Sequence, residues 1–527
     1  MDRGGPVFIS RHMDSQHVQR QGSSRLAGVA KKYRLHCRQA GSNGAADATG
    51  RAAPYPAFGR NPMIPTPVAQ GRHALMDAAR GFAILGILWL NIFIFALPLD
   101  AMGAPGMWGE TMWGSVDPNV EVWRFVGIAV DGVMRGMISV LFGATALILL
   151  ARADSAGGGL AALDPWYRRQ VALIGFGVVH AYLLLWPYDI LYLYGLFGLF
   201  LFPVRNWPVR RLWIVASVMM VMSAIQGGAE ISPLMEQRLE MRNTFSKDEV
   251  MENRAGEPLR QQVDPSPVDE GTTRGIAGSG TQGDGQALPD DEGDAELAQM
   301  LENIESEIIE RQQGYVDNVI SLAPLSFQEQ TSEVIVHHIL DVYTFMLIGL
   351  ALLKSGFLTG GWSLKAYRRL AAGGIAAGTA IGWFTGSRFA DGSTAAMLSD
   401  GLLPYVYDIR RLCFVFGFFS VLALLLASGR ARWFTSRLEA CGRLALTLYV
   451  GQTVVNMVLF LGFGFGLFGR LEHIDIAAIA LVMTLVQFFA APVWIRLFGQ
   501  GPLERLLRRM THGRGTAAPG PAAGSRT

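Results

Sequence analysis

The sequence has little charge and very little cysteine. Only 17% of its 527 residues are charged, against roughly 25% in an average soluble protein. Half of the residues are hydrophobic, and the mean hydropathy is +0.28. This composition excludes an ordinary soluble enzyme. The three cysteines, Cys37, Cys413 and Cys441, show no CxxC or His-rich spacing, so neither a disulfide framework nor a zinc or iron–sulfur site is predicted.

Several common functional motifs are also missing. No block of like charge carries interleaved aromatic residues, so no nucleic-acid partner is expected. No GxSxG elbow, Walker loop or Rossmann glycine pattern appears in a suitable context. Residues 1–70 lack the apolar run of a signal peptide and are predicted to be a disordered extension, in which Met63 is a candidate alternative start.

Long apolar runs are what the sequence has in abundance. Runs of roughly 17 to 25 residues are long enough to cross a membrane as helices. The predicted fold is therefore all-α, a polytopic transmembrane helix bundle of about ten spans, in which the third and fourth could form a re-entrant hairpin. The predicted spans are 75–97, 125–150, 171–187, 189–204, 211–228, 334–354, 368–385, 405–428, 443–467 and 475–497.

The loop charges give this bundle an orientation. Lys and Arg are retained on the cytoplasmic side of a membrane, and basic clusters recur in every second loop and after the last span. Both termini are therefore predicted to be cytoplasmic. The seventh loop is an exception to the pattern, because Arg388, Arg410 and Arg411 are assigned to it together with three aspartates.

A long acidic segment interrupts the spans. Residues 228–333 contain 23 acidic and seven basic side chains. Most of this segment is too polar to bury a core and is predicted to be disordered, but apolar residues three and four apart near 295–320 predict one amphipathic helix. The predicted organisation is an extension (1–70), spans one to five (71–229), an extracytoplasmic insertion (230–333), spans six to ten (334–512) and a disordered tail (513–527).

Charged residues inside apolar spans are functional candidates, because a charge at mid-bilayer costs about 2.5 to 3.5 kcal/mol. In the first span, Asp77, Arg80 and Asn91 form one polar stripe that runs from the cytoplasmic edge past the midplane. In the second span, Asp131 and Arg135 are four residues apart and place one charge of each sign on one face. In both spans the alternative is an ion pair that only holds helices together.

Histidines mark the third and sixth spans. His180 lies near the middle of the third span, which ends at Asp189, and histidine transfers protons readily near neutral pH. His180 is therefore a candidate general base, with a helix–helix hydrogen bond as the alternative. His337, His338 and Asp341 open the sixth span, but adjacent histidines point to different helix faces, so no metal site is predicted.

A series of motifs runs through residues 72–512. Residues 77–92 (DAARGFAILGILWLNI), 177–191 (GVVHAYLLLWPYDIL) and 501–511 (GPLERLLRRMT) are its longest members, and shorter ones occur at 135–143, 348–358 and 442–449. This series resembles the YeiB family of bacterial inner-membrane proteins of unknown function, with its LDxxRGFALLGILLVNI, GLLHALLLWYGDIL and GPLEWLLRxLTY segments. The resemblance implies an inner-membrane location. Two departures are Arg505, where the family has Trp, and Tyr188, where it has Gly.

The first helix is also similar to that of a wider group of membrane acyltransferases, which includes heparan-alpha-glucosaminide N-acetyltransferase and the sugar O-acyltransferases. In that group an Arg is followed by ten residues and then Asn or His, which is the spacing of Arg80 and Asn91. The resemblance implies transfer of an acyl group from cytoplasmic acyl-CoA to a glycan or lipid-linked acceptor. The essential His of the glucosaminide acetyltransferases follows the first span, whereas residues 98–123 contain no His.

This resemblance implies a role for each candidate. Arginine would hold a phosphate or an oxyanion, Asn91 the acyl carbonyl, and His180 would deprotonate the acceptor. The predicted residues are His180 and Asp189 for catalysis, and Asp77, Arg80, Asn91, Asp131 and Arg135 for substrate binding. Acyl-CoA is the expected co-substrate and no bound cofactor is expected. A transporter or export factor for a small polar or anionic solute, and a non-enzymatic membrane accessory protein, remain as alternatives.

Overall fold

The structure, a computed structural model, describes residues 73–102, 118–155, 160–244, 291–386 and 394–512. Within these ranges every regular element is a helix, which confirms the all-α prediction. All of these residues belong to the second of two units of the chain, which spans Pro67–Thr527. The disorder predicted for the N-terminal extension, for the C-terminal tail and for residues 245–290 falls outside the described residues.

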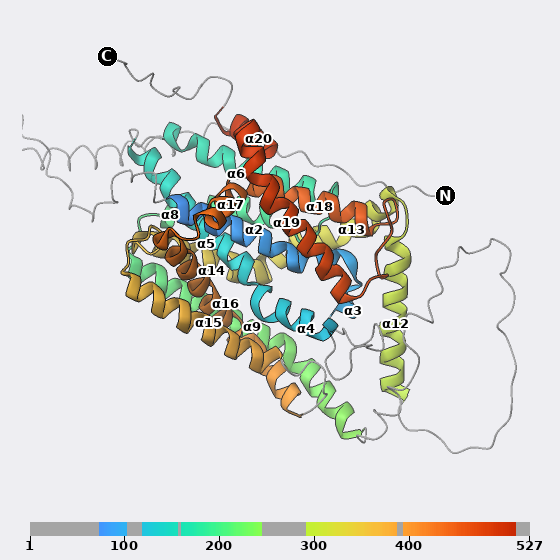
Figure 1. Ribbon diagram of the computed structural model, residues 1–527. Helices are drawn as coiled ribbons and strands as arrows, with labels where there is room; N and C mark the ends of the chain where they lie inside the picture. The colour runs from blue at the N-terminus through green and yellow to red at the C-terminus, as the bar shows by residue number, and fades with distance from the viewer. Residues whose placement is uncertain (1–72, 103–117, 156–159, 245–290, 387–393, 513–527) are drawn as a thin grey trace, which may run out of the picture. The chain divides into compact units, whose positions relative to one another are not determined.

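The helices of the second unit pack side by side as a bundle (Figure 1). Its first part contains α2 (His73–Ala96), α3 (Leu99–Met102), α4 (Pro118–Phe125), the π-helix η3 (Val126–Val130), α5 (Val133–Ser155), α6 (Leu160–Tyr182), α7 (Ile190–Leu199), α8 (Leu201–Val204) and α9 (Val209–Thr244). Its second part contains α12 (Asp291–Arg311), α13 (Tyr315–Gln330), the π-helix η4 (Val334–Tyr343), α14 (Thr344–Lys354), α15 (Leu364–Gly386), α16 (Thr394–Ser428), α17 (Arg432–Arg443), α18 (Ala445–Phe460), α19 (His473–Phe498) and α20 (Pro502–His512).

Six helical segments of the described chain are long and apolar enough to cross a membrane, which identifies a multi-pass membrane protein. They are Ala74–Ala96, Pro118–Arg152, Val209–Ala229, His337–Lys354, Leu402–Ser428 and His473–Phe498. Helices α17 and α18 meet at a bend of 79° and make a seventh span if they are counted as one.

The predicted number of ten spans is not confirmed. The three remaining candidates, 171–187, 189–204 and 368–385, fall in α6, in α7 with α8, and in α15. Helix α7 has only ten residues, and α6 and α15 are less apolar than the six spans because charged and small polar residues interrupt them. These helices pack between or against the longer spans.

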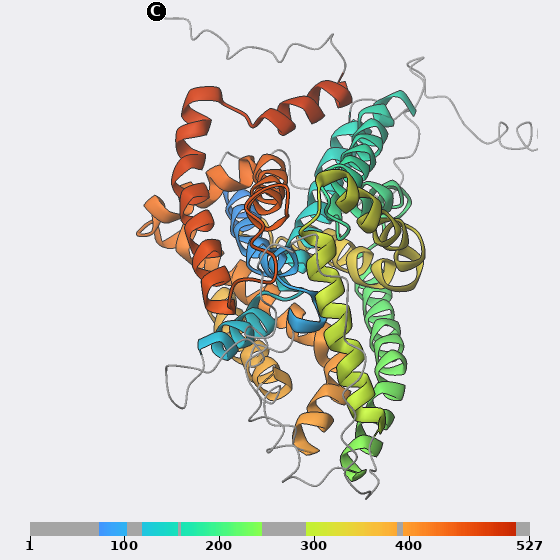
Figure 2. The same cartoon turned by 90° about the vertical axis from the view of Figure 1, so that its right-hand side faces the viewer.

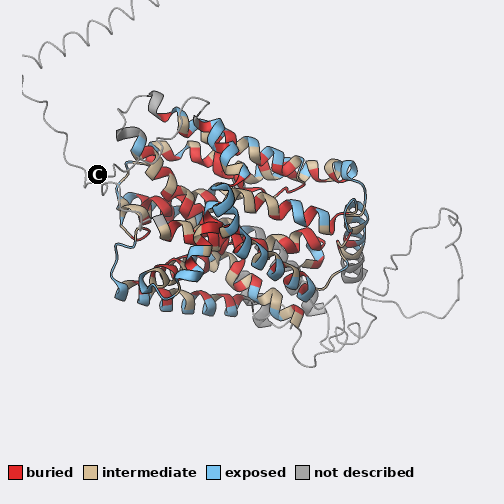
Figure 3. Ribbon diagram, turned by 45° about the horizontal axis from the view of Figure 1, so that its top comes forward, coloured by how far each residue is buried: buried red, intermediate tan, exposed pale blue. Residues whose placement is uncertain are grey.

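The outward faces of two spans are apolar and exposed. On α9, Val218, Val221 and Ile225 are more than half exposed, and only 17% of that span is buried. Helix α19 is similar, with 28% of its span buried. The buried residues instead follow the helices at the centre of the bundle (Figure 3). Because lipid tails solvate apolar side chains, these exposed faces fit contact with the bilayer.

Two glycines, one on α2 and one on α17, allow these helices to pack with their backbones in contact. A Cβ atom on Gly81 would lie 1.9 Å from the backbone oxygen of Leu438, and one on Gly442 would lie 1.9 Å from the backbone oxygen of Asp77. Helices α2 and α17 therefore cross with their backbones in contact, an approach that any larger residue would prevent. This crossing fixes the start of α2, where the first charged residues lie, against the end of α17.

The segment 295–320, which we expected as one amphipathic helix, is covered by α12 and the start of α13, with Gly314 between them. Helix α12 lies across the end of the bundle, near the ends of α2 and α18 (Figure 1 and Figure 2). The Leu99 backbone N–H donates to the Glu307 carboxylate at 3.1 Å, and the Gln312 side-chain amide donates to the backbone oxygen of Gly466 at 3.0 Å. Burial raises the pKa of Glu307 above its usual value.

Candidate functional site

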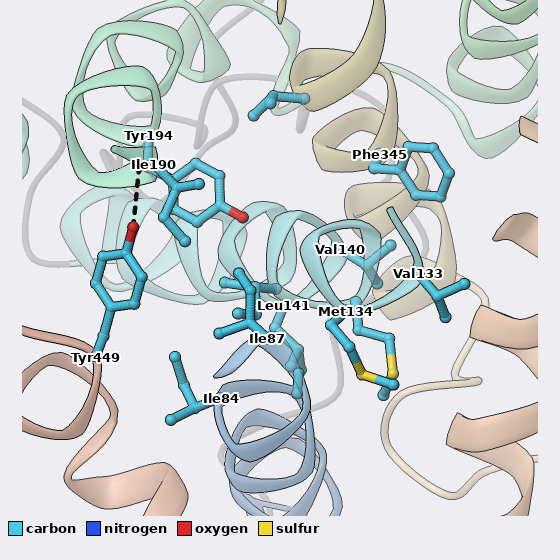
Figure 4. Packing of buried hydrophobic residues seen from close by; sticks show 14 of the residues in the cluster. Ile84, Ile87, Val133, Met134, Val140, Leu141, Ile190, Tyr194, Phe345 and Tyr449 are labelled. Carbon is cyan, nitrogen blue, oxygen red and sulfur yellow. Dashed lines mark hydrogen bonds between the residues drawn. The ribbon is translucent and has the colours of Figure 1, made fainter. Parts of the chain in front are cut away.

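A cavity of about 550 Å³ opens at the end of the bundle that the loop charges predict to be cytoplasmic. This volume is within the range of small-molecule sites, roughly 300 to 1,000 Å³. Its inner walls are largely apolar, and Ile84, Leu141, Ile190, Tyr194 and Tyr449 lie around the same space (Figure 4). These residues come from α2, α5, α7 and α18, and residues of α6, α17 and α20 also line the cavity.

The charged residues that line this cavity are mainly basic, and we call it the arginine cavity. Two acids, Asp77 and Glu504, accompany four arginines and leave a net charge of two positive charges. The four arginines are Arg80, Arg169, Arg443 and Arg508. Such a mouth attracts anions, because focused positive charge raises their local concentration.

Arg80 has the most defined surroundings of the four. Its guanidinium forms an ion pair with the Asp77 carboxylate at 2.8 Å, one helical turn away, and donates to the Thr145 hydroxyl at 3.3 Å. The Arg80 and Asp77 side chains are 26% and 29% exposed. The pair predicted as an alternative to a substrate site therefore forms, yet both side chains line the cavity.

Helix α20 covers one side of the cavity mouth and is tied to α18 by Glu504. One carboxylate oxygen of Glu504 accepts the Thr447 backbone N–H at 3.0 Å, and the other accepts the Thr447 hydroxyl at 2.5 Å. Glu504 thus satisfies an N–H in the first turn of α18 that has no partner within the helix. Gly501 is required beside this contact, since a Cβ atom there would lie 1.9 Å from the Glu504 carboxylate.

His180 and Asp189 form a buried chain of hydrogen-bonded groups with Thr453, a residue that the sequence analysis did not identify. His180 Nδ1 lies 2.6 Å from Asp189 Oδ1, and Nε2 lies 2.9 Å from the Thr453 hydroxyl. Asp189 also accepts the Tyr192 backbone N–H at 2.7 Å and so caps α7. A neutral imidazole with a carboxylate at Nδ1 carries its proton on Nδ1, and its Nε2 then accepts the Thr453 hydroxyl proton. In space, the order hydroxyl, imidazole, carboxylate is that of hydrolase triads.

This chain of groups lies behind the wall of the arginine cavity. His180 is 1% exposed, Asp189 4% and Thr453 3%. The Tyr449 ring, which lines the cavity, lies 5.0 Å from the His180 ring between their centroids. The Tyr449 hydroxyl accepts the indole N–H of Trp186 at 3.1 Å and the Ile190 backbone N–H at 3.4 Å. Tyr449 therefore separates His180 from the open space.

A second set of charges is buried elsewhere in the bundle. Asp341 of η4 lies 2.6 Å from Arg135 of α5 and 2.5 Å from Arg411 of α16, and Arg411 also contacts Asp408 at 2.8 Å. Arg411 is 1% exposed. The loop-charge pattern predicted Arg411 in a loop. Its position inside the apolar run 405–428 is the signal that indicates a buried charge instead.

The expected stripe of Asp131 and Arg135 is divided in the structure. The helix breaks at Asp131 and Gly132, where Gly132 has a φ of +67°, so the two charges are not on one continuous helix. Asp131 instead pairs with Arg410 at 3.3 Å. We call this group the ion cluster: Asp131, Arg135, Asp341, Asp408, Arg410 and Arg411.

The remaining candidates do not join either group. Asn91 is half-buried and is not among the residues that line the arginine cavity. It lies eleven residues beyond Arg80 on α2, about 16 Å along the helix axis. His337 contacts Glu333 at 2.5 Å and His338 contacts Glu329 at 3.0 Å. The structure thus brings Asp77 and Arg80 to the cavity, His180 and Asp189 behind it, and Asp131 and Arg135 to the ion cluster.

Comparisons with known proteins agree with the motif resemblance. Residues 352–514 match the sequence model of a family described as "Protein of unknown function (DUF418)". The chain is 26% identical over 454 residues to the uncharacterized protein YeiB of Escherichia coli, with 84% of this chain and 96% of YeiB covered. It is 24% identical over 448 residues to the uncharacterized protein YxaH of Bacillus subtilis, with 84% and 94% covered. No solved structure matches. The expected resemblance to the YeiB family is confirmed, whereas no similarity to acyltransferases appears among these matches.

Proposed function

We propose that this chain, which is similar to the YeiB and DUF418 proteins, is an inner-membrane enzyme that transfers an acyl group from cytoplasmic acyl-CoA to an extracytoplasmic or lipid-linked acceptor. The observation that carries this proposal is the arginine cavity, with its basic mouth and apolar interior. An acyl-CoA divides in the same way, because its phosphates are anionic and its acyl chain is apolar. Arginine suits the phosphates, since a guanidinium makes paired hydrogen bonds to them.

The depth of each cavity residue suggests its contact with the donor. Arg443 and Arg508 are exposed at the mouth and would meet the phosphates first. Arg80, held by Asp77, lies beside the apolar wall and would meet the part of the donor that enters the cavity. Ile84 belongs to that wall, where an acyl chain gains free energy by leaving water.

His180 would supply the proton transfer that acyl transfer needs. The Asp189 carboxylate holds the imidazole so that Nε2 is the basic nitrogen, which is the atom required to take a proton from an attacking hydroxyl or amine. Because Tyr449 and Thr453 cover His180, the reacting groups reach it only when the Tyr449 side chain moves aside. We therefore expect His180→Ala to abolish transfer while donor binding persists.

The first test is binding of acyl-CoA to the detergent-purified chain, measured as a thermal shift. A ligand that binds only the folded state at 100 times its dissociation constant stabilises it by about 2.7 kcal/mol. We expect saturable stabilisation of the wild type that is lost in Arg80→Ala and weakened in Arg443→Ala. The matched control is Arg430→Ala, because Arg430 is exposed and does not line the cavity. Equal shifts in all four proteins, or none in the wild type, would reject the proposal.

The ion cluster favours a second candidate function, translocation of a small anionic or polar solute. Asp131 and Arg135 are 35% and 34% exposed, whereas their partners Arg410 and Asp341 are 3% and 13% exposed. Charges that are buried on one side and accessible on the other are typical of ion and substrate pathways in membranes. Solute flux into vesicles that contain the protein, in the absence of CoA, would favour this function, and loss of that flux in Arg135→Gln would assign it to the cluster.

A further inference from the structure

The Thr453 hydroxyl is placed as a nucleophile. It lies 2.9 Å from Nε2 of His180, whose Nδ1 lies 2.6 Å from Asp189. An activated hydroxyl nucleophile has this arrangement, in which a base contacts the hydroxyl and a third group orients the base. We propose that Thr453 carries the acyl group as a covalent ester between two half-reactions, an inference that rests on the proposed acyl-CoA site.

Thr453 continues the face of α18 that lines the arginine cavity. Leu446 and Tyr449 both line it, and Thr453 follows Tyr449 by four residues, so all three lie on one side of the helix. Thr453 is therefore one turn deeper than Tyr449 along the same wall. A thioester carbonyl that passes the Tyr449 ring meets the Thr453 hydroxyl next.

A second cavity lies on the other side of this chain of groups. It has a volume of about 40 Å³, shares no lining residue with the arginine cavity, and is lined in part by Leu185, Trp186, Tyr188 and Glu307. Leu185 has a φ of +52° and is the one residue other than glycine with a positive φ in the described chain. Strained backbone of this kind persists where the surrounding structure imposes it, often at functional sites.

The separation of the two cavities explains why a covalent intermediate suits this site. Trp186, which lines the second cavity, donates to Tyr449, which lines the first, so these two side chains form the wall between them. A donor in the arginine cavity does not meet an acceptor that approaches from the side of the second cavity while this wall is closed. An acyl group held on Thr453, inside the wall, can be received from one side and released to the other.

Each half-reaction passes one proton through His180 Nε2. The Thr453 oxygen attacks the thioester carbonyl and its proton passes to His180 Nε2; the carbon–sulfur bond then breaks, and the CoA sulfur takes that proton. In the second half, the acceptor hydroxyl or amine gives its proton to His180 Nε2 and attacks the ester carbonyl. The Thr453 oxygen leaves and takes the proton back. Each half therefore ends with a neutral imidazole and an unchanged Asp189.

The test is exchange of labelled CoA into unlabelled acetyl-CoA or octanoyl-CoA by the full-length purified protein without any acceptor. A covalent acyl intermediate makes this exchange obligatory, and acid-quenched samples should carry the acyl group on the peptide that contains Thr453. We expect Thr453→Val to lower exchange roughly a hundredfold or more, and Thr453→Ser to retain it. Thr435→Val is the matched control, because Thr435 is equally buried and its hydroxyl bonds only the backbone of its own helix.

The outcomes separate this inference from the proposed function. If the wild type binds acyl-CoA but catalyses no exchange, or if Thr453→Val exchanges as fast as the wild type, Thr453 is not the nucleophile, and direct transfer with His180 as base remains. If no acyl-CoA binds the folded wild type, the proposed function fails and this inference fails with it. A Thr453→Val protein whose thermal unfolding matches that of Thr435→Val shows that a loss of exchange is not a loss of fold.

Discussion

Four arginines and two acids line the arginine cavity, whereas in the ion cluster three arginines face three aspartates. The cavity arginines Arg443 and Arg508 are exposed, while Arg410 and Arg411 of the cluster are 3% and 1% exposed. Equal numbers of opposite charges in contact attract a charged ligand only weakly. The excess of positive charge around an open space is what points to the cavity as a binding site.

The largest effect should come from removing one acid of the ion cluster. Asp341→Ala leaves Arg135 and Arg411 without their shared partner, and breaking a buried ion pair in this way costs about 3 to 5 kcal/mol. We expect a large fall in the temperature of thermal unfolding in detergent. Asp164→Ala, at an exposed ion pair, should stay within about 0.5 kcal/mol of the wild type. Similar stabilities for the two variants would mean that the cluster does not hold the bundle together.

The predicted parts of the fold are those that depend on local composition. Apolar runs predicted the six spans, and the charged residues of the motif 77–92 led to Asp77 and Arg80, which line the cavity. Length alone did not separate the spans from other long helices. Helix α15, for example, is 23 residues long like a span, and its lower hydropathy distinguishes it.

The partners of buried charges were not predictable for a different reason. Arg135 pairs with Asp341, about 200 residues away, and His180 contacts Thr453 across 273 residues. Periodicity relates residues of one helix and says nothing about which helices become neighbours. The prediction that Asp131 and Arg135 share one helix face was wrong, because it required a continuous helix and Gly132 interrupts the helix.

The second prediction concerns the backbone contact between α2 and α17. It tests whether this contact shapes the arginine cavity, as the ion pairs stabilise the ion cluster. Gly442→Ala places a methyl group 1.9 Å from the backbone oxygen of Asp77, so α17 must move away from α2. Overpacking of this kind costs about 1 to 3 kcal/mol, and acyl-CoA binding should weaken because Asp77 and Arg80 shift. Gly373→Ala is the control, since nothing lies within 4 Å of its Cβ position. Unchanged acyl-CoA binding in a destabilised Gly442→Ala protein would show that the contact between α2 and α17 does not position the binding residues.

A third prediction uses salt to separate the two groups of charges. Exposed charges are screened within about 8 Å at physiological ionic strength, whereas buried pairs are screened much less. Raising sodium chloride from 0.1 to 0.5 M should weaken acyl-CoA binding roughly threefold or more, because Arg443 and Arg508 are exposed. Thermal stability without ligand should change little. Binding that is insensitive to salt would show that the mouth arginines do not contact the donor phosphates.

The smallest effect concerns acid pH at a carboxylate that belongs to neither group. A hydrogen bond from Gln328 holds the pKa of Glu333 below its usual value, and the nearby His337 acts in the same direction. A lowered pKa means that the folded state prefers the charged carboxylate, so this contribution to stability is present above the ordinary carboxyl range near 4.3 and is lost as pH falls below it. The Glu333 side chain is 22% exposed, and single charged contacts near the surface of a protein are typically worth less than about 1 kcal/mol, so the loss should stay below that value. Glu333→Gln should flatten this part of the pH–stability curve without altering acyl-CoA binding at neutral pH, and an unchanged curve would show that the contact with Gln328 contributes nothing to folding.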